Sequence, residues 1–272
     1  YALLGVCAVF TYRLVAVVNF TGAAIGTTGT FVMVVLQQAG VPLAPAVVIG
    51  LAAGTLAGVV VGAVTTTWFA ESDASTKAAV TVALFIGIVA VGLRLTGGQH
   101  PHPFPELVPG SALRLAGVEL TNAALLALAL AVVFTLLADQ FLRRTRTGLH
   151  LRALAERPLA AELLGVRVRR LSLLVWGVTG AVTTLALMIV APQRSPDFMS
   201  LSLLVVPALA AALVGFFRNF WAALVGGVAI GVIEGVASRL GGSNQYRGAL
   251  PFFVILAVLL WAQRKARWDE AR

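Results

Sequence analysis

The sequence predicts an all-α protein, a polytopic bundle of about eight to ten transmembrane helices. Of its 272 residues, 59% are hydrophobic and only 11% are charged, and the mean hydropathy is +0.94. A soluble domain carries about 25% charged residues, because its surface must face water. The stretch from Leu14 to Ala70 contains no Asp, Glu, Lys or Arg, and one helical crossing needs roughly 20 apolar residues. The surface of this chain therefore faces lipid.

Glycines, prolines and charged residues divide the chain into apolar segments, which we expect to form one transmembrane domain over residues 1–272. The chain begins at Tyr1, without a methionine, so we expect preceding sequence to be missing. Two of the segments are short enough to include half-helices or a re-entrant element, which membranes tolerate only where protein or a cavity shields the backbone. These two are 199–216 and 221–237. The full set of segments is about 1–13, 22–39, 44–64, 78–93, 121–142, 171–191, 199–216, 221–237 and 249–262.

Positive charge predicts the orientation of these segments. Arginines cluster between Arg143 and Arg170, and basic clusters beside apolar spans mark the cytoplasmic side. If residues 143–170 are cytoplasmic, the C-terminus is also inside, whereas residues 96–120 form an extracytoplasmic loop. The net charge of +9 does not indicate a nucleic-acid partner, because the basic clusters lack interleaved aromatic residues and a soluble fold around them.

Two ladders of glycines recur at four-residue spacing. This spacing places small residues on one face of a helix, where another backbone can approach closely. We expect both ladders to pack helices together, and the alternative is that they line a moving interface or pathway. The first ladder is Gly50, Gly54, Gly58 and Gly62, and the second is Gly227, Gly231 and Gly235.

Two polar residues lie within apolar runs and are candidates for function. Asn19 is either a hydrogen-bonding link between helices or part of a broken helix near a pathway. Glu234 is an intramembrane carboxylate, which is by default a functional candidate. Because Arg239 follows five residues later, we expect an ion pair or a side chain reaching the interface rather than proton coupling.

Residues for catalysis or metal binding are not arranged in any recognisable pattern. His100 and His102 share a spacing that fits a metal, but the prolines around them favour a stiff outer loop. Cys7 is the only cysteine, so neither a disulfide within the chain nor a thiolate cluster can form. Neither Lys77 nor Lys265 follows the glycines of a phosphate-binding loop. We therefore expect no catalytic residues, no metal and no cofactor, and the chain is not an ATP-hydrolysing subunit.

The segment 143–170 is too polar to cross a membrane, yet Leu149–Gly165 has helical spacing of apolar residues. Pro158 is expected to begin a second helical stretch or kink the first, and Gly165 to end it. Periodicity alone leaves three interpretations open. The helix could lie on the anionic leaflet, connect two spans through solvent, or insert into a groove on a partner.

The residues of this helix resemble the coupling helix of ABC importer permeases. The match includes Gly148, Arg152-Ala153, Ala155, Ala161 and Leu164-Gly165, and within these importers it is most similar to the branched-chain-amino-acid-type (LivH-like) permease family. The resemblance implies that ATPase coupling falls to Arg152, Ala153, Ala155, Glu156, Ala160, Ala161, Leu164 and Gly165.

Two further blocks resemble the same family in the same order. Asn19-Phe20 followed by Gly29 resembles a segment near the first crossings, and Gly226-Gly227, Gly231 and Glu234 resemble a later one. The chain departs from the family where it has Gly22, because relatives commonly carry His or Gln there, and the next two residues are alanines. The candidate pathway residues are Asn19, Phe20, Thr21 and Gly22.

The resemblance implies a permease subunit of a bacterial ABC importer in the plasma (inner) membrane. Its partners would be ABC ATPase subunits that bind ATP and Mg, a second permease that is identical or related, an extracytoplasmic substrate-binding protein and membrane lipid. The cargo would be a small polar solute, a branched-chain amino acid first, with amides, urea or small carboxylates as alternatives. The main rival interpretation is a stand-alone secondary transporter or channel, and a membrane-embedded enzyme comes third.

Overall fold

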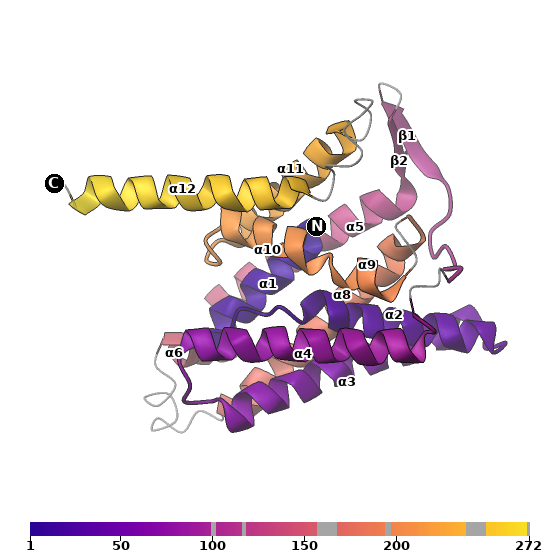
Figure 1. The fold of residues 1–272 in the computed structure, drawn as a ribbon, viewed down its shortest axis with the longest axis horizontal. Coiled ribbons are helices and arrows are strands. Elements are labelled where there is room, and N and C mark those ends of the chain that lie inside the picture. Colours follow the sequence, from indigo (N-terminus) through magenta and orange to yellow (C-terminus); the bar gives the residue numbers. More distant parts are fainter. Residues whose placement is uncertain (99–101, 116–117, 157–167, 194–196, 238–248, 271–272) are drawn as a thin grey trace.

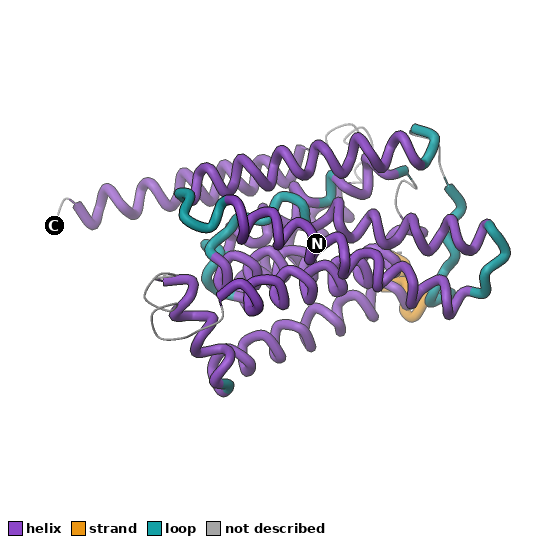
Figure 2. Tube along the Cα trace, turned by 90° about the horizontal axis from the view of Figure 1, so that it is seen from below, coloured by secondary structure: helices purple, strands orange, loops and turns teal. Residues whose placement is uncertain are grey.

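The computed structural model describes residues 1–98, 102–115, 118–156, 168–193, 197–237 and 249–270. These residues form a bundle of helices, most of which run along the long axis of the molecule (Figures 1 and 2). In chain order the elements are α1 (Ala2–Val15), α2 (Gly22–Gln38), α3 (Leu43–Trp68), α4 (Ala74–Leu95), β1 (Ser111–Leu115), β2 (Val118–Thr121), α5 (Asn122–Arg144), α6 (Arg146–Glu156), α8 (Val168–Val190), η1 (Ala191–Gln193), α9 (Phe198–Ser202), α10 (Val205–Val214), α11 (Phe220–Ala237) and α12 (Leu250–Glu270).

The polytopic helical fold predicted from composition is confirmed. In the described part of the chain, five helices are long and apolar enough to cross a membrane, namely α3, α4, α5, α8 continued by η1, and α11. Shorter apolar helices are α1, the stretch Phe198–Val214 and the Pro251–Trp261 part of α12. Of the two segments that could include half-helices, 199–216 is divided into α9 and α10, whereas 221–237 forms the continuous helix α11.

The long loop between α4 and α5 holds the one local departure from the all-helical prediction among the described residues. Here β1 and β2 pair antiparallel, with Leu115 opposite Val118 and an irregular register between Ser111 and Leu113. This hairpin lies at one end of the bundle, whereas α6 and the connection between α3 and α4 lie at the other (Figure 1). The loops that charge predicts to be on opposite sides of the membrane are therefore at opposite ends of the molecule.

Helix α8 is the central helix of the bundle. Of its most apolar window, 61% is buried inside the protein, compared with 17% to 28% for α3, α4 and α5. The outer helices carry many exposed apolar side chains, for example Leu56 on α3, Ile86 on α4 and Leu137 on α5. Such faces suit a lipid environment, where packing and small residues rather than hydrophobicity hold helices together.

The first glycine ladder lies where α3 meets α8 and α2. A Cβ atom added at Gly58 would lie 2.5 Å from the Trp176 carbonyl oxygen, and one at Gly62 would lie 2.6 Å from the Trp176 ring. Farther along, a Cβ atom on Gly50 would lie 2.6 Å from the Gly29 carbonyl oxygen of α2. Added carbons at these positions have no room, so the three helices approach backbone to backbone.

The three glycines of the second ladder differ in how closely other described atoms approach them. A Cβ atom on Gly227 would collide with the backbone of Ala2 at the start of α1. At Gly231 the nearest atom would be a ring carbon of Tyr1 at 3.8 Å, which is an ordinary contact. A Cβ atom on Gly235 would meet no described atom within 4 Å. Among these three glycines, only Gly227 is in close contact with another described backbone.

Substituting alanine at Gly58 is expected to destabilise the protein, because the new methyl group would displace a backbone carbonyl of α8. Overpacking of this kind typically costs about 1–3 kcal/mol. Gly87→Ala is the matched control, since Gly87 is exposed on α4 and its added carbon would meet nothing within 4 Å. Thermal unfolding of both variants in detergent should show a lower midpoint for Gly58→Ala alone. Equal midpoints would contradict the packing described for α3 and α8.

Candidate functional site

The chain is not helical between α1 and α2, although this stretch is apolar. Helix α1 ends at Val15, and Ala16 adopts a left-handed conformation with φ 56°. The Val18 carbonyl then accepts a hydrogen bond of 2.9 Å from the Thr81 hydroxyl of α4. Irregular backbone at membrane depth needs partners of this kind, because lipid supplies none.

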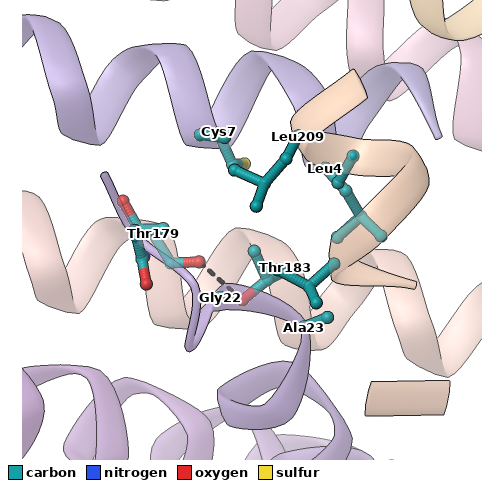
Figure 3. Close-up of a pocket in the computed structure, with 11 residues that line it drawn as sticks. Leu4, Cys7, Gly22, Ala23, Thr179, Thr183 and Leu209 are labelled. Carbon is teal, nitrogen blue, oxygen red and sulfur yellow. Dashed lines mark hydrogen bonds between the residues drawn. The ribbon is translucent and has the colours of Figure 1, made fainter. Parts of the chain in front are cut away.

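A small cavity lies beside this break, with room for about one water molecule (Figure 3). Helices α1, α2, α8 and α10 contribute to its wall together with the break, through residues that include Cys7, Asn19, Gly22, Thr179, Thr183 and Val205.

The cavity lies near half the depth of the bundle. Its threonines belong to the central turns of α8, which runs from Val168 to Val190. The start of α2 lines this cavity, and so does Cys7, which lies in the middle of α1. Segment 22–39 therefore begins inside the protein, and our expectation that it crosses from one face to the other is wrong for its first turn. The segment bounds placed an interruption between residues 13 and 22, but composition could not show that it lies inside the protein.

Asn19 presents an unpaired amide group at this cavity. The side chain is 3% exposed, and its Oδ1 atom accepts bonds from the Thr21 backbone N–H at 2.9 Å and the Thr21 hydroxyl at 2.7 Å. Because a backbone N–H can only donate, the atom facing it must be the oxygen, and the other atom is the amide nitrogen. This Nδ2 atom has no hydrogen-bond partner among the described residues, although buried polar groups are nearly always paired.

The start of α2 is also uncapped by any side chain. By contrast, Asp73 caps α4 and Asp197 caps α9 by accepting bonds from backbone N–H groups. The first N–H groups of a helix have no partner within the helix and carry a partial positive charge. The end of α2 that faces the cavity is therefore suited to a negative group.

Two threonine hydroxyls of α8 also line the cavity. Thr179 donates to the Val175 carbonyl at 2.8 Å, and Thr183 donates to the Thr179 carbonyl at 2.8 Å. Figure 3 shows both threonines at the cavity, on α8. The Thr179 hydroxyl also lies 3.1 Å from the Thr11 hydroxyl of α1. Because a hydroxyl oxygen has two acceptor lone pairs, both threonine oxygens keep capacity to accept from a group in the cavity.

The four candidate pathway residues lie together at this break. Asn19 and Thr21 are buried, whereas Phe20 and Gly22 are partly exposed. A Cβ atom on Gly22 would lie 3.5 Å from Asn19 Nδ2. The glycine that departs from the family pattern therefore leaves space directly beside the unpaired amide. Sequence reasoning missed Thr179 and Thr183, although their four-residue spacing in an apolar helix was a usable signal.

The first turn of the predicted coupling helix is attached to the end of α5. The Thr145 hydroxyl accepts a 2.9 Å hydrogen bond from the Gly148 N–H, and Leu151 is buried against the core. A Cβ atom on Gly148 would collide with the Phe141 carbonyl oxygen.

The coupling residues themselves are described only in part. Four of them are in α6, but their side chains lie outside the described part of the structure, namely Arg152, Ala153, Ala155 and Glu156. The other four lie outside the described residues altogether, as do Pro158 and the helix end predicted at Gly165, and they are Ala160, Ala161, Leu164 and Gly165.

Two other candidates have local partners. Glu234 is buried and accepts a hydrogen bond from the Tyr1 hydroxyl, while Arg239 lies outside the described residues. The two ring nitrogens of His102 contact the Gln38 amide at 3.4 Å and the Thr96 carbonyl oxygen at 3.0 Å. No group of three metal-ligating side chains occurs among the described residues. His100 lies outside the described residues.

Comparison with known proteins relates the chain to transport permeases. The family model described as the permease component of the branched-chain amino acid transport system matches residues 1–259. A probable branched-chain amino acid transport permease protein, LivH of Methanocaldococcus jannaschii, is 30% identical over 139 residues. That alignment covers 48% of this chain and 44% of the relative, so it spans less than half of either protein. No solved structure matches the chain.

Cys7 lines the cavity, so the reactivity of its thiol tests whether the cavity is closed. Cys7 is 1% exposed, so we expect a thiol-reactive methanethiosulfonate reagent to modify it slowly in the resting protein. The control is Ala39→Cys in a Cys7→Ser background, because Ala39 is exposed at the end of α2. Mass spectrometry over time should show rapid modification of the control only. Equal rates at both positions would contradict the closed cavity.

Proposed function

Because the chain belongs to the branched-chain amino acid transport permease family, we propose that it is the membrane-spanning permease subunit of a bacterial ABC importer in the plasma membrane. In this proposal it forms the pathway for a branched-chain or related amino acid, and partner ATPases supply the energy. The family consists of transport permeases rather than enzymes, so the role of this chain is to bind and move a solute.

The cavity beside the break between α1 and α2 is the observation that carries the proposal. It combines a helix that begins inside the protein, an unpaired amide on Asn19 and hydroxyl oxygens on α8. Transporters commonly place their solute site near the bilayer midplane, between helices that are interrupted there. The cavity is too small for an amino acid in this conformation, so passage requires the surrounding helices to move apart.

Alternating access supplies that movement in our proposal. A ligand or partner shifts such an equilibrium only by its different affinity for the two states. ATP-bound partner subunits would favour one arrangement of the helices and the nucleotide-free subunits the other. The glycine contacts of α3 with α2 and α8 make these three helices a compact unit that could move as a rigid body.

The predicted coupling helix would carry this movement to the membrane. Helix α6 lies at the end of the bundle that charge predicts to be cytoplasmic, and its first turn is fixed to α5 through Thr145 and Gly148. A force on α6 would therefore act on α5 directly. The complete importer would include two ATPases that bind ATP and Mg, a second permease and an extracytoplasmic binding protein.

Variants at the predicted coupling helix test this function. Glu156→Arg and Gly165→Trp should abolish amino acid uptake and separate ATP hydrolysis from transport, because each disturbs a surface proposed to fit an ATPase groove. The matched control is Glu71→Arg, which reverses the same charge in the exposed connection between α3 and α4. Uptake and ATPase activity should be measured with membrane insertion confirmed. Normal uptake by both coupling variants would refute the coupling assignment.

A further inference from the structure

The cavity between α1, α2, α8 and α10 offers polar groups of opposite character on its two sides. One side has only hydrogen-bond donors left unused, namely Asn19 Nδ2 and the first N–H groups of α2. The other side has the oxygens of Thr179 and Thr183, which donate within α8 and keep acceptor capacity, although Thr179 also lies 3.1 Å from the Thr11 hydroxyl. A ligand that satisfies both sides needs an acceptor at one end and a donor at the other.

We propose that this cavity is the closed form of a binding station for the carboxylate and ammonium groups of an α-amino acid. The proposal rests on the importer function proposed above and identifies the part of the cargo that the pathway recognises. The carboxylate would accept from Asn19 Nδ2 and the start of α2, where the partial positive charge of the helix favours an anion. The ammonium group would donate to the two threonine oxygens.

A neutral solute fits this arrangement less well. Urea and simple amides supply no anion for the start of α2, so they gain only neutral hydrogen bonds. Hydrogen bonds to charged groups are stronger than those between neutral partners. Among the cargoes left open by the sequence, the station therefore selects solutes that carry a carboxylate. Gly22 contributes by leaving the amide accessible, because a larger side chain there would start 3.5 Å from Nδ2.

Asn19→Asp isolates the donor in this station. An aspartate retains an oxygen that can accept from both groups of Thr21, so the local turn is kept while the amide nitrogen becomes an oxygen. Thr135→Val is the matched control. The buried Thr135 hydroxyl of α5 has no partner among the described residues, and α5 contributes no residue to the cavity wall. Its substitution removes an equally unused polar group elsewhere.

Two measurements on the complete transporter test the proposal. The first is the thermal stability of the purified complex with millimolar leucine, leucinamide or isoamylamine, which differ at the carboxylate. Leucine alone should stabilise the wild type and Thr135→Val, and Asn19→Asp should lose this effect. The second is uptake of leucine in proteoliposomes, where Asn19→Asp should raise KM about tenfold or more, as expected when a charged hydrogen bond is lost.

The possible outcomes separate the two proposals. If the wild type imports leucine with ATP and Asn19→Asp keeps its KM and its stabilisation by leucine, the station is refuted, the cavity holds water only, and the importer function stands. If leucinamide or isoamylamine stabilises as well as leucine, carboxylate recognition is refuted. If leucine stabilises only proteins with Asn19 but no ATP-dependent uptake occurs, the station stands and the importer function fails.

Discussion

Backbone that leaves a helix at membrane depth must be shielded by protein, and this constraint governs the structure around the break between α1 and α2. Lipid offers no hydrogen-bonding partner to an exposed N–H or carbonyl group, and each unsatisfied group costs several kcal/mol. Thr81 satisfies the Val18 carbonyl, and Asn19 accepts from the Thr21 N–H. The break is therefore supported from two sides, and Asn19, whose Nδ2 atom has no partner among the described residues, lines the cavity.

Close packing of α2, α3 and α8 provides the enclosure that this break requires. The glycines of α3 allow its backbone to touch α8, and Gly29 of α2 meets Gly50 of α3 in the same way. Helix α8 is thereby held at the centre, which brings Thr179 and Thr183 to the cavity. The ladder is thus a packing device that also determines which polar atoms face a solute.

The sequence predicted the class of fold well, because lipid imposes a composition that few other environments permit. It also identified Asn19 as unusual, since a polar amide in an uncharged apolar run must have a partner or a function. The segment bounds 1–13 and 22–39 separate the two helices close to where the structure does, but composition could not show that residues 16–21 lie inside the bundle rather than at its surface. Thr179 and Thr183 escaped notice for a related reason: a threonine that bonds to its own helix looks neutral in sequence. The hairpin of β1 and β2 was hidden because a short strand pair in a polar loop has little periodicity.

The central claim is that this permease works with ATPases and a second permease, and affinity purification from the native membrane tests it most directly. The chain should be isolated in mild detergent and the accompanying proteins identified by mass spectrometry. The account predicts one or two ATP-binding-cassette proteins together with a related permease, or a second copy of this chain. A chain that purifies alone and still moves solute across liposomes without ATP would contradict the account and would establish a stand-alone transporter or channel instead.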